Sequence, residues 1–241
     1  MRGWEAIACF ESFDAGVEFC SALTQAPGIV KKEVCFFSEA VARFITQFEP
    51  HLPAGQHAAL LAVAESSEGG VLDMVEAFGS RITYRKTAEE VAKSNRTLLE
   101  ATWNHTTLHA LKIDKTITCI QTSFEPARHV EQVKTMERLL GGEVLMHLEF
   151  LRTKEGEAHC SGLPLVRYSN EARLNEIMQI HRDHGVMINN PHVYVVEDGK
   201  QARLNPGVVE SKARFDPQGL LNPGKLRACS LREGAGSPPT G

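Results

Sequence analysis

The sequence predicts an α+β protein in which two similar halves share a mostly antiparallel sheet with helices on one face. In both halves, short apolar segments suited to strands alternate with amphipathic segments suited to helices. A polar and aromatic segment, residues 87–112, separates the halves, and Glu155-Gly156 is typical of a hairpin turn. Short hairpins alternating with helices predict duplicated ferredoxin-like units, each a strand-helix-strand-strand-helix-strand unit.

The first half begins with an apolar strand and a helix. Ser12 is a suitable N-cap because its hydroxyl can accept a hydrogen bond from a free backbone N–H of the first turn. Pro27-Gly28 ends this helix, and Gly69-Gly70 opens the last helix of this half. Strands are expected at residues 4–10, 29–36 and 60–65, and helices at 13–23, 38–48 and 71–78.

The connecting segment opens with Thr87-Ala-Glu-Glu90, a capping-box pattern that starts a helix. The second half then repeats the alternation, with Gly141-Gly142 ending one helix, Asn170 capping the next and Gly185 ending it. Strands are expected at 116–124, 143–152, 158–166 and 186–196, and helices at 127–140 and 170–184. Residues 228–241 are poor in apolar side chains and are expected to be a disordered tail.

Composition narrows the functional classes. The chain has 241 residues, 42% of them hydrophobic, and a formal charge of −4, so nucleic acid and anionic membranes are poor partners. No apolar run reaches the roughly 20 residues of a membrane helix, and the N-terminus lacks the apolar core of a signal peptide. We therefore expect a cytoplasmic protein. Its six cysteines form no C-x-x-C pair, which argues against a disulfide framework or a zinc ribbon.

The C-terminal run A-R-F-D-P-Q-G-L-L-N-P-G-K-L, residues 213–226, predicts a stiff loop. Two X-Pro steps, at Asp216-Pro217 and Asn222-Pro223, restrict the backbone, so Asn222 and Lys225 are expected at fixed positions. Turn chemistry alone fits equally well with a loop that merely ends a domain. The run F-D-P-Q-G-L-L-N-P-G-K resembles the C-terminal signature of FAD-linked oxidases of the vanillyl-alcohol oxidase and p-cresol methylhydroxylase type. That group includes glycolate oxidase and D-lactate dehydrogenase relatives.

The resemblance implies that residues 1–227 are the cap domain of such an oxidase, which covers the flavin and forms the substrate side of the pocket. It implies FAD as cofactor, with Asp216, Asn222, Pro223 and Lys225 beside it. The chain departs from the family because no G-x-G-x-x-G lies between a strand and a helix, so a cradle for the FAD pyrophosphate is not found. The chain is then either a truncated product or one piece of a split enzyme. Its expected partner is an FAD-binding domain or chain supplied in trans. The cap surface that would close over the flavin is expected to be exposed in this chain, so self-association into a homo-oligomer is also expected.

The segment Trp103-Asn104-His105-Thr106-Thr107 is the main catalytic candidate. An imidazole that titrates near neutral pH could take the hydroxyl proton of an alcohol or hydroxy acid. T-W-N-H-T-T-L is also similar to a motif found in a branch of these flavin oxidases, which implies that Trp103 contacts the substrate while Asn104 and His105 are catalytic. The alternative is a helix end whose Asn and Thr side chains only cap backbone groups.

Two further residues are candidates for the pocket, His192 as a catalytic residue and Arg152 as a substrate-binding residue. His192 lies where hydroxy-acid dehydrogenases of the family carry a glutamate and histidine, although Asn-Pro precedes it here and their G-D-G-N metal segment is not found. Arg152 could bind a substrate carboxylate through two hydrogen bonds, or be a solvated charge at a strand end. His105 and His109 lie four residues apart but lack a clear third ligand, so no metal site is predicted.

Two functions remain open. In the first, the chain is the cap portion of an FAD-dependent oxidoreductase that oxidises a small alcohol or 2-hydroxy acid, and it is inactive without an FAD-binding domain. Alternatively, it is a non-catalytic cap remnant that acts as a binding module. The family resemblance favours the first function, and the lack of a pyrophosphate cradle favours the second for this polypeptide alone.

Overall fold

The computed structural model describes residues 3–198 and 204–227. The chain forms two compact units, Met1–Ile188 and Asn189–Gly241, which are described separately below. Within the described residues, no helix is both long enough and apolar enough to span a membrane. The predicted disordered tail, residues 228–241, lies outside the described residues.

The first half of the larger unit is a β-α-β-β-α-β arrangement. Its strands lie in the order β4-β1-β3-β2, and the pairs β1/β3, β1/β4 and β2/β3 are all antiparallel. The elements are β1 (Gly3–Phe10), α1 (Phe13–Gln25), β2 (Lys31–Phe37), β3 (His57–Ala64), α3 (Glu68–Ala77) and β4 (Arg81–Lys86).

The second half repeats this arrangement, and its strands extend the same sheet. They lie in the order β11-β6-β9-β8, and β8 pairs with β2 in antiparallel fashion, so one eight-stranded sheet runs through both halves. This is the split β-α-β order occurring twice, which confirms the predicted α+β class with a shared antiparallel sheet. The elements are β6 (Gln121–Ser123), α6 (His129–Leu140), β8 (His147–Arg152), β9 (Ala158–Gly162), α7 (Glu171–Asp183) and β11 (Met187–Asn189).

Three long strands predicted in the second half are each broken in the middle. The N-terminal piece of the first two, and the C-terminal piece of the third, leave the large sheet and form a second sheet in the order β5-β10-β7. The breaks fall at Ile120, at Met146 and at Leu163-Pro164. The strands of this smaller sheet are β5 (Ile117–Cys119), β7 (Val144–Leu145) and β10 (Leu165–Arg167).

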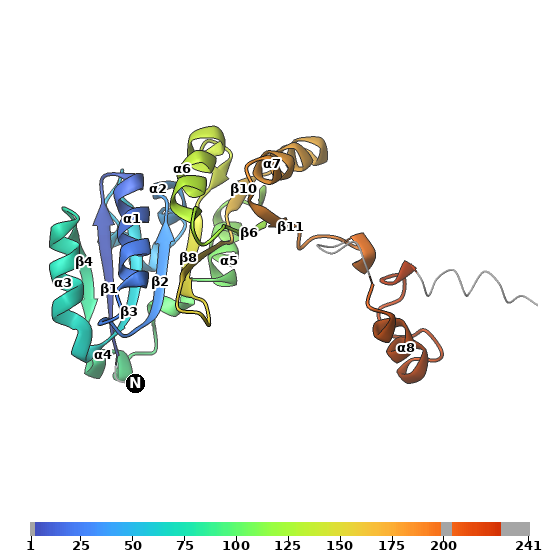
Figure 1. The fold of residues 1–241 in the computed structure, drawn as a ribbon, viewed down its shortest axis with the longest axis horizontal. Helices are drawn as coiled ribbons and strands as arrows, with labels where there is room; N and C mark the ends of the chain where they lie inside the picture. Colours follow the sequence, from blue (N-terminus) through green and yellow to red (C-terminus); the bar gives the residue numbers. More distant parts are fainter. Residues whose placement is uncertain (1–2, 199–203, 228–241) are drawn as a thin grey trace, which may run out of the picture. The chain divides into compact units, whose positions relative to one another are not determined.

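Four helices of this unit, α1, α3, α6 and α7, cover one face of the large sheet. Figure 1 shows α1 and α6 lying side by side along the strands. The helices contribute buried apolar side chains to a core that includes the strand residues facing them, as the helical period predicts. Representative members are Trp4, Phe19, Phe36, Val71, Met136 and Ile177.

The opposite face is also covered, by shorter elements and the small sheet. Its apolar core contains Ile7, Cys35, Phe37 and Leu60 from the large sheet. The covering elements are α2 (Glu39–Ala42), η1 (Thr46–His51), η3 (Leu98–Glu100), α5 (Asn104–Ile113) and the small sheet. The candidate site lies on this face.

Several predicted helix boundaries are confirmed by their caps, whereas Gly69-Gly70, predicted to precede the last helix of the first half, lies inside α3, which begins at Glu68. The Ser12 hydroxyl accepts a hydrogen bond from Ala15 N, and Asn170 accepts one from Arg173 N. Thr87 and Glu90 form the predicted capping box at the start of α4 (Ala88–Lys93). Gly185, with φ of 75°, follows α7 and supplies the left-handed turn for which glycine is suited.

Two predicted elements are shorter than expected. The helix predicted at 38–48 is only α2 followed by the 3-10 turn η1, which contains Pro50, a residue that cannot donate to an α-helix. The strand predicted at 186–196 stops at Asn189 because Asn190-Pro191 turns the chain. Strand β4 is present although the sequence pattern did not reveal it.

The smaller unit contains η4 (Val196–Asp198) and α8 (Pro206–Phe215). Asn205 caps α8 by accepting a hydrogen bond from Gly207 N, and Pro206 occupies the first helical position, where its missing N–H is not needed. The predicted stiff loop follows α8 directly.

Candidate functional site

Three glutamates point from the large sheet to its second face, where apolar side chains would be expected. Glu5 on β1, Glu33 on β2 and Glu149 on β8 share this face with Ile7 and Cys35 because side chains alternate along a strand. Glu5 and Glu149 are buried, with 3% and 0% of their surface exposed. Buried carboxyl groups need hydrogen-bond partners, because an unpaired one is costly.

The partners come from the segment between α4 and α5. The Leu98 N–H donates to Glu5 Oε2 at 3.0 Å, and the Trp103 N–H donates to Glu149 Oε1 at 2.7 Å. The Trp103 indole N–H also donates to Glu33 Oε2 at 3.3 Å. The three glutamates therefore fix residues 98–103, which we call the strap, across the sheet.

Trp103 has an unusual backbone conformation at the end of the strap. Its φ of 52° and ψ of −138° lie in a region that a bulky side chain rarely adopts. Such a conformation costs on the order of 1–3 kcal/mol and persists only where surrounding contacts enforce it. Here the bonds to Glu149 and Glu33 enforce it, and they leave the indole 39% exposed at the edge of the site.

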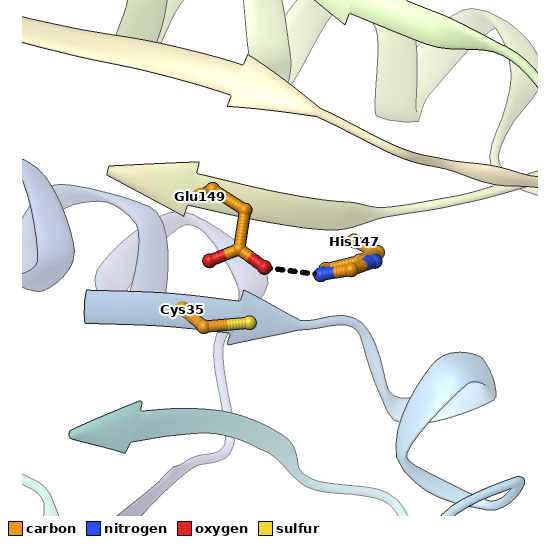
Figure 2. A group of neighbouring side chains, drawn as sticks. All are labelled: Cys35, His147 and Glu149. Atoms are coloured by element: carbon orange, nitrogen blue, oxygen red, sulfur yellow. Dashed lines mark hydrogen bonds and ion pairs between the residues drawn. The ribbon is translucent and has the colours of Figure 1, made fainter. Parts of the chain in front are cut away.

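Glu149 belongs to a fully buried cluster with His147 and Cys35. His147 Nε2 lies 2.7 Å from Glu149 Oε1, and the His147 ring packs edge-on against Phe37 with centroids 5.0 Å apart. Cys35 is the cross-strand partner of Glu149, and Figure 2 shows its sulfur on the same side of the sheet as the carboxylate and the imidazole. All three side chains are 0% exposed.

Burial shifts every ionisable group of the cluster toward its neutral form. Desolvation lowers the pKa of His147 to about 3 and raises the pKa of Glu149. Desolvation and the neighbouring Glu149 carboxyl raise the pKa of Glu33 to about 8, and desolvation raises the pKa of the Cys35 thiol. At neutral pH the His147 imidazole is therefore neutral, and burial disfavours the charged form of the carboxyl groups beside it.

The structure places the predicted catalytic residues at the exposed start of α5. Asn104 and His105 are exposed beside Trp103, whereas Thr106 is buried and its hydroxyl donates to the Ala101 carbonyl. His109, one turn further, is bound to the carbonyl of Glu100 at 3.0 Å. Only His105 therefore presents an accessible imidazole next to the indole.

Arg152 has a structural contact. Its guanidinium donates to the Gly156 carbonyl from Nε at 3.1 Å and from Nη2 at 2.9 Å, closing the β8–β9 hairpin that the sequence predicts at Glu155-Gly156. It is exposed at the end of β8, consistent with the strand-end charge that was the alternative interpretation. Its role in substrate binding stays a prediction.

The C-terminal loop is organised around Asp216. Its carboxylate accepts hydrogen bonds from Leu220 N at 2.8 Å and Leu221 N at 2.9 Å, and from the Lys212 ammonium. The Lys212 contact, followed by these backbone bonds, lowers the pKa of Asp216. Both oxygens are therefore used inside the loop, so Asp216 fits a loop-building role better than a direct contact to flavin.

The other predicted flavin contacts have different environments within the same unit. Asn222, with φ of 47°, and Pro223 are exposed. The Lys225 ammonium lies 3.8 Å from the centre of the Tyr194 ring, a cation–π contact, and its carbonyl accepts from Val196 N at 2.9 Å. Asn222 and Lys225 thus present an amide and an ammonium group, and their contact with flavin stays a prediction.

His192 is exposed in the turn after β11, where its backbone N–H donates to the Asn190 side chain at 3.0 Å. The candidate residues Trp103, Asn104 and His105 belong to the larger unit, whereas His192, Asn222 and Lys225 belong to the smaller one.

Sequence reasoning missed Cys35, His147 and Glu149, along with Glu33. The sequence signal that could have found them is the alternation of buried and exposed side chains along a strand. These residues lie in β2 and β8, and residues two positions away on the same face, such as Phe37, are buried. A histidine and glutamates at such positions are unusual enough to mark a site. Their proximity to each other depends on the pairing of β2 with β8, which no local pattern reveals.

Comparisons with known proteins found similarity in the solved structures and none in the sequences. No protein-family profile matches the sequence, and no curated protein sequence matches it. Among solved structures, two crystal forms of alkyldihydroxyacetonephosphate synthase are similar, each with a TM-score of 0.53, at 10% and 9% identity. The matches cover 93% and 92% of this chain but only 45% and 44% of the synthase, so this chain spans less than half of those proteins. The likeness shows that this chain shares its fold with part of that synthase.

Proposed function

We propose that this chain is the substrate-side part of an FAD-dependent oxidoreductase that oxidises a small alcohol or 2-hydroxy acid. The observation that carries the proposal is the likeness in fold to an FAD-linked oxidase over 93% of this chain. The flavin-binding part of the enzyme is a further domain or chain, because the match leaves more than half of the synthase without a counterpart here. FAD, when bound, supplies the acceptor for the hydride that leaves the substrate carbon.

The residues of this chain have separate tasks in the proposal. The exposed His105 imidazole takes the hydroxyl proton of the substrate, and the half-exposed Trp103 indole forms one wall against which the substrate lies. The strap supports both, since Glu149 and Glu33 fix the residue that precedes α5. Asn222 and Lys225 bind the flavin edge through their amide and ammonium groups.

The test is purification of the tagged chain from its native cells, which retains any partner. We expect a flavin absorbance spectrum in the native material, whereas the chain produced alone should be colourless. Anaerobic addition of small alcohols and 2-hydroxy acids should bleach the flavin band with at least one of them. Native material without flavin would refute the proposal, and bound flavin that no such substrate bleaches would favour the alternative, a non-catalytic binding module.

Substitutions paired with control substitutions test the role proposed for each residue. His105→Asn should slow flavin reduction by about 10²- to 10⁴-fold, the usual contribution of a general base. His109→Asn is the control because that imidazole already binds the Glu100 carbonyl on the same helix. Asn222→Ala and Lys225→Ala should weaken flavin retention, while Arg214→Ala, on α8, should not. If the control substitutions slowed flavin reduction or weakened flavin retention as much as the test substitutions, the proposed roles of the tested residues would be wrong.

A further inference from the structure

The cluster of Cys35, His147 and Glu149 has the composition of a metal centre. One sulfur, one imidazole nitrogen and one carboxylate oxygen all lie within 4.8 Å of one another. They come from two paired strands, β2 and β8, and Figure 2 shows the three side chains converging on one side of the sheet. Strands position such groups more firmly than loops do.

The contacts inside the cluster leave one buried polar atom without a hydrogen bond. Glu149 Oε2 makes no hydrogen bond among the described residues, although the side chain is 0% exposed. Buried polar atoms are almost always paired in proteins, and an exception calls for a reason such as an ion. An apolar pair at these strand positions would pack without that cost, as Phe37 does beside them.

The distances suit a small ion. A tetrahedral zinc ion, with bonds of about 2.0–2.3 Å, places its ligand atoms roughly 3.3–3.6 Å apart. That separation falls inside the 4.8 Å limit of the cluster.

We propose that Cys35, His147 and Glu149 bind one divalent cation of the zinc class. A thiolate and an imidazole together select a borderline-soft ion, whereas calcium and magnesium prefer oxygen ligands throughout. Three protein ligands leave a fourth position open, and Glu33 borders the cluster on that face. The Trp103 N–H supports the site by orienting the Glu149 carboxylate, as groups around metal ligands commonly do.

Cobalt(II) tests the proposal because a thiolate bound to cobalt gives a charge-transfer band in the near ultraviolet. The full chain is stripped with chelator, and one equivalent of cobalt is added either to the folded protein or during refolding. We expect the band at one cobalt per chain, with its loss when zinc displaces cobalt. Absence of the band under both conditions would overturn the proposal, and the assay needs no flavin, so it is independent of the proposed function.

Variants distinguish the site from other thiols. Cys35→Ser should abolish the band, and His147→Gln should weaken cobalt binding by roughly tenfold or more. Cys160→Ser is the matched control, since Cys160 is an equally buried cysteine in β9 that belongs to the core on the opposite face of the sheet. Circular dichroism checks that each variant folds. A band that survives Cys35→Ser, or that disappears in Cys160→Ser, would contradict the assignment.

Discussion

Replacing Glu137 by glutamine should change how the stability of the protein depends on pH. Glu137 lies on α6, and its Oε2 is buried and makes no hydrogen bond among the described residues. The facing helix α1 carries Asp14 and Glu18, both paired with Lys134 on α6. Burial, followed by the charge of Asp14, raises the pKa of Glu137 from 4.5 to about 7.

Whether stability rises or falls with pH depends on whether the folded or the unfolded state binds the Glu137 proton more tightly. The folded state holds the Glu137 proton more strongly than the unfolded state, so this residue contributes its full stability below pH 4.5. That contribution is lost as the pH rises through about 7. A shift from 4.5 to about 7 is 2.5 pKa units, or about 3.4 kcal/mol at 1.36 kcal/mol per unit. Because the side chain is partly exposed, about 2 kcal/mol is the expected effect.

Urea unfolding followed by circular dichroism measures the difference between the parent and Glu137→Gln. We expect the variant to be more stable by about 2 kcal/mol at pH 8.5 and nearly equal to the parent at pH 4. Glu131→Gln is the control because Glu131 is exposed on the same helix. If the gain from Glu137→Gln were the same at both pH values, the buried carboxylate would not be its cause.

Two further changes test packing in each unit. Gly162→Ala should destabilise the protein by about 1–3 kcal/mol, because the added Cβ would lie 2.3 Å from Thr122 Oγ1, whereas Gly142→Ala, with no atom within 4 Å, should be nearly neutral in urea unfolding. Asp216→Ala should speed protease cleavage within residues 216–226, because the backbone N–H groups it binds lose their acceptor, while the unfolding midpoint of unit Met1–Ile188 stays unchanged. Unchanged cleavage would show that Asp216 does not hold the loop.

The alternation of strands and helices was predictable because it depends on local pattern, and the caps at Ser12 and Asn170 lie where their sequences place them. The breaks in the long strands were not. At Ile120 and Met146 the residue type gives no sign of the break, since both are apolar and fully buried as strand residues are. An apolar residue in a strand pattern is expected to be buried, but the pattern does not show which residue leaves one sheet for another. Only Pro164 marked a break in the sequence, because proline cannot donate to a sheet.

The site was partly predictable. The dense polar groups around Trp103 lie at the end of the strap, where the Trp103 backbone N–H and indole bind Glu149 and Glu33 and the Thr106 hydroxyl donates to the Ala101 carbonyl. The acceptors, Glu149 and Glu33, lie on two other strands. Their contribution depends on the fold, so the sequence around Trp103 could not indicate it.

The strap explains why carboxylates occupy a face that otherwise packs apolar side chains. Leu98 and Trp103 would bury backbone N–H groups against the sheet, and a buried N–H needs an acceptor. Apolar residues at the positions of Glu5 and Glu149 would pack well but leave those donors unpaired, so the glutamates are needed wherever the strap crosses. Glu149 then has one oxygen committed to Trp103 and His147 and a second without a hydrogen bond. Glu149 therefore links the exposed Trp103 indole to the buried cluster. An ion bound by the second oxygen of Glu149 would affect the position of Trp103 through this one carboxylate.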